Sequence, residues 1–300
     1  MVKGERFTGS EMLSVSIVTY RPDALLLNKT IASLCRAVAH TFDNAPHSAQ
    51  VPLLIVDNDD ELSAGVLSIG APGGMDCITG NEVGGADAVA VRVIKGQGNV
   101  GYGRGHNLAL AQTLARYHLV LNPDIDISPD ALRIALQFME AHPEVGLLTP
   151  RITDADGSLQ YLCRRYPTVL DLFVRGFLPR RLRAPFRHRL QRYELHDLLD
   201  RAESAFDSDD YPTPPIVSGC FMLFRGEVLK QTGGFDPRYF LYFEDYDLSL
   251  RTQRLAKIAY VPTVRIVHFG GGAARKGWWH IRLFMTSAFK FFNRFGWRWA

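Results

Sequence analysis

Short apolar runs alternate with amphipathic stretches along the first half of the chain. Runs rich in β-branched residues predict buried strands over residues 13–20, 51–56, 89–94 and 119–121. Between the first two strands, apolar residues recur at helical spacing from residue 25 to residue 38, which predicts an amphipathic helix. A strand, a helix and a strand in this order form a parallel pair with a right-handed crossover. The pattern therefore predicts an α/β fold built on a mostly parallel central sheet.

The second half of the chain continues the alternation with longer polar interruptions. It predicts helices over residues 108–117, 131–141, 227–231 and 244–255, and strands over residues 145–149, 216–224, 258–261 and 264–267. Ser128 is the expected N-cap of the second of these helices, with Pro129 at the first helical position. Residues 61–88 are rich in Gly and Ala, and we expect a variable loop there.

Polar side chains follow the predicted strands at the points where the strands end. Thr19 and Tyr20 close the first strand, Asp57 and Asn58 follow the second, and the strand at 119–121 is followed by Asn122-Pro123-Asp124-Ile125-Asp126. Open α/β sheets bind ligands at the carboxyl ends of their strands. Mg²⁺ and Mn²⁺ prefer carboxylate oxygens and often bridge them to a diphosphate. The pattern indicates a metal–nucleotide-sugar site; the alternative is a turn in which Asp and Asn cap the local backbone.

A second acidic stretch lies between residues 240 and 251. Glu244, Asp245 and Asp247 fall within four positions, after an aromatic run and before an apolar helical pattern. Asp and Glu are rarely buried without partners, so acids embedded among Phe and Tyr indicate carboxylates with tuned chemistry. The alternative is an acidic first helical turn that faces the helix dipole.

Seven segments carry a family resemblance, and they appear in the family's order. They are SIVTY at 16–20, LLIVDN at 53–58, GNVGYGRGHN at 98–107, LNPDIDI at 121–127, VSGCFMLFR at 217–225, GGFDPRYFLYFEDYDLSLR at 233–251 and VHFGGG at 267–272. With these segments the chain resembles the family 2 glycosyltransferases of the GT-A fold, and specifically the bacterial rhamnosyltransferase branch. The resemblance implies inverting transfer of L-rhamnose from dTDP-L-rhamnose to a polyprenyl-diphosphate-linked sugar or a growing O-antigen of lipopolysaccharide type.

The resemblance also assigns the donor and acceptor side of the site. It implies that Asp57 contacts the nucleotide base, where a carboxylate can accept the ring N–H of uracil or thymine. It places Asn99, Gly101 and Asn107 near the sugar nucleotide, with Arg104 facing the diphosphate. Thr19, Tyr20, Asn58 and Asn122 join the substrate site, and the strand with Ser218 and Gly219 lies beside the acceptor and the donor sugar. A dinucleotide fingerprint does not fit the Gly-rich segment, because His106 occupies its third glycine position.

The resemblance implies roles for the carboxylates. Asp124 would hold a divalent cation, Mg²⁺ or Mn²⁺, with help from Asn122, Asp126 or His268, and the ion would neutralise the leaving diphosphate. Asp245 would be the general base, while Glu244 and Asp247 would orient it or raise its basicity. The chain presents Asn-Pro-Asp in place of the usual DxD, which leaves the number of metal-binding carboxylates open, although the rhamnosyltransferase branch shows the same triplet. His268 has a purely structural role as its alternative.

Two other function classes share part of this sequence pattern. A nucleotidyltransferase also combines a parallel sheet with a Gly-rich loop and metal carboxylates, but it would need a Gly-rich basic signature directly after the first strand. The chain has TYRPD there, without glycine. A non-catalytic sugar- or membrane-binding relative would be indicated by loss of Asp124 or Asp245, and both are intact.

Composition limits the compartment and the partners. A net charge of +3 gives no overall field for nucleic acid, and we expect none as a partner. Four widely spaced cysteines without a CxxC motif argue against a disulfide framework or a zinc site and fit a reducing cytosol. The first twelve residues lack the apolar core of a signal peptide, and no apolar run is long enough to span a membrane. We therefore expect a cytoplasmic protein.

Two regions flank the expected catalytic core. Residues 162–212 form an insertion with a basic and an acidic part, expected to be an acceptor-side or membrane-facing surface; the alternative is a solvated helical face. Residues 273–300 are aromatic and basic, a composition typical of helices that lie at a membrane interface. The alternative is a C-terminal helix that docks on the core. We expect a GT-A domain over 1–272, with a nucleotide-sugar half at 12–127 and an acceptor half at 128–272. The protein would lie peripherally on the inner face of the cytoplasmic membrane.

Overall fold

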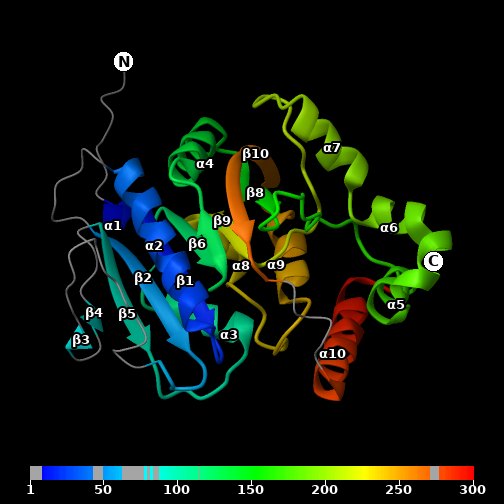
Figure 1. The fold of residues 1–300 in the computed structure, drawn as a ribbon, viewed down its shortest axis with the longest axis horizontal. Helices are drawn as coiled ribbons and strands as arrows, with labels where there is room; N and C mark the ends of the chain where they lie inside the picture. The colour runs from blue at the N-terminus through cyan, green and yellow to red at the C-terminus, as the bar shows by residue number, and fades with distance from the viewer. Residues whose placement is uncertain are drawn as a thin grey trace.

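The central feature of the fold is one mixed sheet. The computed structural model describes residues 9–42, 50–62, 78–79, 82–83, 88–113, 115–270 and 277–300. Within them, ten strands lie in the order β3-β4-β5-β2-β1-β6-β9-β8-β10-β7, with helices on both faces (Figure 1). The predicted α/β class is therefore confirmed. Most of the variable loop predicted at 61–88 lies outside the described residues.

The first half of the sheet is mainly parallel. Its strands β5 (Val89–Ile94), β2 (Val51–Asp57), β1 (Leu13–Thr19) and β6 (Tyr117–Leu121) run in one direction, and the short β4 (Glu82–Val83) and β3 (Ile78–Thr79) extend its edge in antiparallel pairing. In the β1–β2 register, Thr19 lies opposite Asp57. Because parallel strands share the direction of their carboxyl ends, the polar residues after them gather at one edge of the sheet.

The second half of the sheet contains the reversals. Strand β9 (Phe221–Arg225) is antiparallel to both β6 and β8 (Val145–Thr153), and β10 (Lys257–His268) is parallel to β8 and antiparallel to β7 (Ile125–Ile127). We predicted two strands where the structure has the single strand β10. Its register with β8 shifts between Val261 and Arg265, around Pro262, because proline has no N–H for the ladder.

Helices α2 (Ala24–Thr41) and α4 (Ala131–Ala141) cover one face of the sheet. The predicted stripe Leu27, Ile31, Leu34 and Val38 is buried there. The predicted cap of α4 is wrong. The helix begins after Asp130, and the Ala131 N–H donates to the Ser128 carbonyl oxygen, so residues 128–130 form a turn before it.

The second part of the Gly-rich segment forms the start of a helix. Helix α3 (Tyr102–Leu110) begins six residues before the helix that we predicted, and Tyr117 already belongs to β6. A β-carbon at Gly103 would lie 2.8 Å from Phe235 Cβ, and one at Gly105 would lie 2.8 Å from Val18 Cγ2. The glycines therefore let α3 pack closely against β1 and the 233–240 segment, a long-range requirement that local propensity does not reveal.

The 162–212 insertion is folded into short helices beside the sheet. They are α5 (Val169–Phe177), η1 (Arg180–Leu182), η2 (Ala184–Phe186), α6 (Arg187–Tyr193) and α7 (His196–Ser204). Helix α5 opens with a capping box in which Thr168 and Asp171 exchange side-chain and backbone hydrogen bonds. Figure 1 shows α5, α6 and α7 on the same side of the molecule as α10 (Trp278–Phe295).

Helix α10 packs against the second half of the chain. Its residues Ala288, Phe291 and Phe292 are buried in a cluster that includes Tyr239, and Ser287 is also buried. The remaining helices are α1 (Gly9–Met12), α8 (Gly226–Thr232) and α9 (Glu244–Thr252). In the part of the chain that the structure describes, no helix is both long and apolar enough to cross a membrane.

Candidate active site

The carboxyl edge of β1 and β2 forms one wall of the site. Thr19 is buried and its hydroxyl lies 3.4 Å from Asp57 Oδ1, while Tyr20, the next residue, is half exposed. Asn58 is fixed by its N–H, which donates to Thr19 O at 2.9 Å, and by its amide, which donates to Gly101 O at 3.2 Å. Asn58 Oδ1 is buried without a hydrogen-bond partner, so it remains available as an acceptor.

Asp57 has an unusual environment for a carboxylate at a strand end. It is fully buried, and its Oδ2 accepts the Leu62 N–H at 2.9 Å. Burial and the hydrogen bond shared with Asp59 together raise the pKa of Asp57 to about 6, against the opposing effect of backbone N–H donors. The nearest cation is Lys95, whose Nζ lies 3.9 Å from Oδ2. Asp57 therefore titrates close to neutral pH.

The segment before α3 and the first residue of this helix lie beside the strand-end wall. Asn99 Oδ1 accepts the Gly101 N–H at 3.1 Å, and the Tyr102 N–H donates to Phe240 O at 3.1 Å. Gly101 has φ +86°, and a β-carbon there would lie 2.2 Å from Phe240 O. Only glycine fits this position. Asn99 and Gly101 thus shape the loop that the resemblance assigned to the sugar nucleotide.

Tyr102 joins the two sides of the site, and the sequence did not single it out. Its hydroxyl donates to Gly219 O at 2.6 Å and lies 3.0 Å from Asn122 Oδ1. Burial raises the pKa of this phenol well above its ordinary value, and the negative charges of Glu244, Asp245 and Asp124 act in the same direction. The only sequence signal was an aromatic residue between two glycines.

Asp124 and His268 form the candidate metal corner. His268 Nε2 lies 3.5 Å from Asp124 Oδ1, and its Nδ1 lies 2.9 Å from Gln160 Oε1. When Nδ1 donates to Gln160, Nε2 presents its lone pair toward Asp124, which is the form of imidazole that binds a metal. Gln160 was missed because it is close to this corner only through the hairpin after β8.

This corner has the chemistry that a divalent cation needs. Asp124 Oδ1 is buried without a hydrogen-bond partner. A β-carbon at Gly270 would lie 2.4 Å from His268 Nε2 and 2.6 Å from Asp124 Oδ2, so this glycine keeps the space beside both groups free. Mg²⁺ sites commonly combine one or two carboxylates with substrate phosphates and water. Among the described residues, no group of three or more His, Cys, Asp or Glu could hold a metal.

Asp126 does not join this corner. Its carboxylate lies 3.3 Å from Lys29 Nζ and 3.5 Å from Arg36 Nη2, both on α2. Helix α2 lies along β7, where Thr30 and Ser33 accept the N–H groups of the residues on either side of Asp126, so Asp126 is within reach of these two cations, whereas Asp124 precedes the strand. The geometry therefore gives no support to the prediction that Asp126 holds the metal.

Glu244 and Asp245 begin α9 beside Gly219. The two residues before them, Tyr242 and Phe243, have φ +70° and +66°, a left-handed conformation that side chains rarely adopt. Such strain costs about 1–3 kcal/mol per residue and is concentrated at functional sites. Asp245 Oδ2 accepts the Gly219 N–H at 3.1 Å.

The two carboxyls differ in their partners, and this difference decides which one holds a proton. Burial raises the pKa of Asp245, whereas N–H donors from Gly219 and Tyr246 favour its charged form. Burial and the charge of Asp245 raise the pKa of Glu244 to about 8. Glu244 Oε2 is buried without a partner. With its pKa of about 8, Glu244 therefore holds a proton at neutral pH, and the N–H donors make Asp245 the member of the pair that is favoured as the carboxylate.

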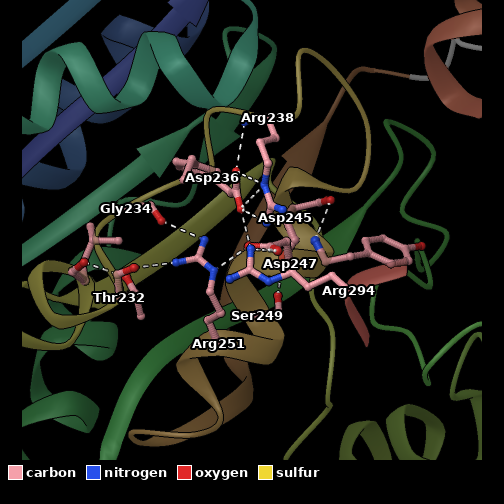
Figure 2. A network of polar contacts seen from close by, with 12 residues as sticks. Thr232, Gly234, Asp236, Arg238, Asp245, Asp247, Ser249, Arg251 and Arg294 are labelled. Atoms are coloured by element: carbon pink, nitrogen blue, oxygen red, sulfur yellow. Dashed lines mark hydrogen bonds and ion pairs between the residues drawn. The ribbon is translucent and has the colours of Figure 1, made fainter. Parts of the chain in front are cut away.

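Asp247 faces away from this pair, into an ionic network. Figure 2 shows its carboxylate between Arg251 and Arg294, at 2.5 and 2.7 Å. Arg251 also donates to Thr232 O and Gly234 O. Arg294, on α10, reaches Asp236 as well. Asp247 thus anchors α9 to α8 and α10, and the structure does not place it with the predicted substrate residues.

Arg104 and Asn107 also contact the protein chain. The Arg104 guanidinium donates to Pro237 O at 2.6 Å. Asn107 accepts the Phe235 N–H at 2.9 Å and donates to Phe235 O at 2.7 Å. Their observed contacts hold the 235–240 segment against α3, and Arg104 remains exposed.

Residues 80–299 match the model of the family described as Glycosyltransferase like family 2. The chain belongs to this family. The match favours the glycosyltransferase interpretation of the strand-end site over the nucleotidyltransferase alternative.

Two relatives of this family 2 glycosyltransferase are rhamnosyltransferases. N-acetylglucosaminyl-diphospho-decaprenol L-rhamnosyltransferase of Mycobacterium tuberculosis is 29% identical over 194 residues, which cover 59% of this chain and 58% of that enzyme. Rhamnosyltransferase WbbL of Escherichia coli K12 is 25% identical over 214 residues, which cover 66% of this chain and 72% of that enzyme. The chain thus spans little more than half the length of the mycobacterial relative.

Solved structures confirm the GT-A fold. Mannosyltransferase PcManGT from Pyrobaculum calidifontis, in complex with GDP-Man and Mn²⁺, matches with a TM-score of 0.52 at 16% identity, over 90% of this chain and 60% of that chain. Staphylococcus aureus TarS 1–349, in complex with UDP-GlcNAc, matches with a TM-score of 0.52 at 14% identity, over 89% of this chain and 61% of that chain. At such low identity the likeness concerns the fold alone.

Proposed function

We propose that this protein is an inverting glycosyltransferase, which moves a sugar from a nucleoside-diphosphate donor to an acceptor hydroxyl. The observation that carries the proposal is the connection between Asp245 and the strand-end edge. Asp245 binds the Gly219 N–H, Tyr102 binds the Gly219 carbonyl oxygen, and the same hydroxyl faces Asn122, two residues before Asp124. A proton acceptor and a candidate metal ligand therefore lie on two sides of one continuous site.

Asp245 is the general base in this proposal. It takes the proton of the acceptor hydroxyl while that oxygen forms a bond to the anomeric carbon and the bond from that carbon to the diphosphate oxygen breaks. Glu244, with a pKa of about 8, stays protonated at neutral pH and adds no second charge to the pair. A divalent cation, Mg²⁺ or Mn²⁺, held by Asp124 and His268 would supply charge neutralisation for the leaving diphosphate.

The strand-end wall is the proposed nucleotide site. Asp57 and Asn58 Oδ1 offer acceptors for ring N–H groups of uracil or thymine, and Asn99 and Gly101 shape the loop beside them. The names of the two relatives support L-rhamnose as the sugar, and the name of the mycobacterial relative supports a lipid-linked acceptor. The family resemblance adds dTDP-L-rhamnose as the proposed donor and a lipid-linked or polysaccharide acceptor of cell-surface glycan synthesis.

Release of nucleoside diphosphate tests the activity. The purified protein is incubated with Mg²⁺ or Mn²⁺ and, separately, with dTDP-L-rhamnose, UDP-GlcNAc, UDP-galactose or GDP-mannose. We expect metal-dependent release of dTDP from dTDP-L-rhamnose above the rate of the other donors. Binding and turnover of none of the four donors by folded protein would refute the donor site.

An exposed surface on α5 and α10 supports a membrane as partner. Apolar side chains are exposed along both helices and after α10: Phe173, Phe177, Trp278, Trp279, Met285, Phe289 and Trp299. Exposed Arg181, Arg187 and Arg282 lie on or between these helices. Trp at the headgroup level and basic residues near anionic lipid are typical of interfacial surfaces. We therefore propose peripheral association with the inner face of the cytoplasmic membrane.

Flotation with vesicles tests this surface. We expect the protein to float with phosphatidylglycerol-containing vesicles and to be released by high salt, and the double substitution Trp278→Ser and Trp279→Ser to reduce the bound fraction severalfold. Leu25, exposed on α2 far from this surface in sequence, gives the control Leu25→Ser. Equal flotation of the Trp variant and the control would contradict the assignment.

A further inference from the structure

A cavity of about 190 Å³ opens beside the proposed catalytic base. Asp245, Glu244 and Ser218 form its floor, and Arg164 and Arg175 reach it from residues 162–177. Asp245 belongs to the lining of this cavity, whereas the strand-end residues Asp57 and Asn58 do not. An acceptor that presents its hydroxyl to Asp245 would therefore occupy it.

Two arginines line this cavity and share one carboxylate partner outside it. Arg164 Nη2 and Arg175 Nε lie 3.7 and 3.1 Å from the same oxygen, Glu194 Oε1. His196 shares that carboxylate at 3.5 Å. Inside the cavity, the carboxylate of Asp245 is the group on which the charge of Arg164 acts. Because Arg175 shares its carboxylate partner with Arg164, its guanidinium can pair with a further anion.

The two guanidiniums differ in what they can reach. The Arg164 side chain is only 4% exposed and donates to the carbonyl oxygens of Tyr161 and Cys163. Its charge acts on Asp245, whose pKa it lowers. The Arg175 side chain is 42% exposed, and its contact with Glu194 is made through Nε. Arg164 is therefore the fixed charge, and Arg175 is the group that can close on a ligand.

An aromatic wall leads from the cavity to the molecular surface. Tyr242, Phe243 and Phe284 line the cavity, and Phe243 packs against Phe284 with ring centres 5.2 Å apart. The Phe284 ring lies 6.3 Å from Phe177, which stacks on the exposed Phe173 at 6.0 Å. A ligand with an anionic group and an apolar chain matches both the charge and the path.

We propose that Arg164 and Arg175 are the specificity pair for a phosphate-bearing acceptor, and that the wall from Phe284 to Phe173 receives its apolar chain. This inference rests on the proposed transferase activity and adds the residues that recognise the acceptor. Arginine suits phosphate because its planar guanidinium makes paired N–H···O bonds. The residues of the proposed nucleotide site, Asp57, Asn58 and Asn99, do not line this cavity, so the donor and the acceptor phosphates would have separate sites.

Binding of farnesyl diphosphate in EDTA tests the pair without donor or metal. By calorimetry we expect wild type to bind farnesyl diphosphate at least tenfold more tightly than farnesol. Because Arg175→Gln loses one charge-assisted contact, we expect it to bind farnesyl diphosphate about tenfold or more weakly than wild type and to bind farnesol with unchanged affinity. The affinity of Arg175→Lys for farnesyl diphosphate is expected to lie between the affinities of wild type and of Arg175→Gln. Arg164→Lys provides a second variant that keeps the buried charge.

Two matched controls separate this site from other causes. Arg133→Gln removes one arginine charge on α4, and Asp124→Ala disables the candidate metal corner; both should bind farnesyl diphosphate like wild type. Equal affinity of Arg175→Gln and wild type, equal affinity for farnesol and its diphosphate, or no binding at all would overturn the proposal. The donor assay can succeed or fail independently, so the two proposals fail in distinguishable ways.

Discussion

Replacing Asp245 by Asn is expected to lower the rate of sugar transfer by about 10²–10⁴-fold, the usual contribution of a general base. The amide keeps the size of the side chain and its carbonyl oxygen can still accept the Gly219 N–H, so the fold should survive. What is lost is the ability to take the acceptor proton. Initial rates with saturating donor, together with donor affinity, would show a loss in kcat with little change in donor binding.

Glu244→Gln is the matched control for this prediction. Gln resembles the protonated Glu244 that prevails below its pKa of about 8, so most of the activity at pH 7 should remain. Above pH 8 the wild-type Glu244 ionises and adds a second charge beside Asp245. The wild-type rate profile should therefore show an inflection near pH 8 that the Gln variant lacks. Equal loss of activity in both variants at pH 7 would contradict the assignment of Asp245 as the base.

Asp124→Asn is expected to lower metal-dependent donor turnover by about 10²–10³-fold, because a bound cation contributes several kcal/mol of charge stabilisation. The amide is neutral, and only the unpartnered carboxylate oxygen beside His268 loses its charge. The measurement is release of nucleoside diphosphate across a titration of Mn²⁺, with metal affinity from the half-maximal concentration.

Asp126→Asn is the control for the metal corner. Asp126 is two residues away but pairs with Lys29 and Arg36, so its substitution should leave the Mn²⁺ titration unchanged. Gln160→Leu should weaken the apparent Mn²⁺ affinity about tenfold, since the imidazole of His268 loses its orienting partner. If Asp126→Asn impaired turnover as strongly as Asp124→Asn, the metal would belong on the α2 side.

Local patterns predicted most of the elements, because strands and amphipathic helices repeat with their own periods. The buried stripe of α2 and the strands β1, β2 and β5 were found in this way. Helix α3 was misplaced because its glycines are explained by Phe235 and Val18, which are distant in sequence. A pattern within one segment cannot record the shape of a partner that is distant in the sequence.

The same limit applies to the site. Residues after parallel strands could be predicted to gather, since topology alone brings Thr19 and Asp57 together. Tyr102 and Gln160 could not be predicted as site residues, because each joins the site through long-range hydrogen bonds. Asp247 was assigned to the substrate because it lies two residues after Asp245, but two residues are a little more than half a helical turn, which directs Asp247 away from Asp245 and toward Arg294.

The contacts of Arg294 have a consequence for how this protein changes over evolution. They join α10 to Asp236 and Asp247, which precede Arg294 by 58 and 47 positions. A substitution of Arg294 removes one of the two arginines around the buried Asp247, and a substitution of Asp247 removes the carboxylate that Arg251 and Arg294 share. Because either change leaves the network unbalanced, these positions should be inherited and altered together. Recombination can exchange the C-terminal helix between two members of the family. The position of α9 would be preserved only where both parent proteins have Asp236, Asp247 and Arg294.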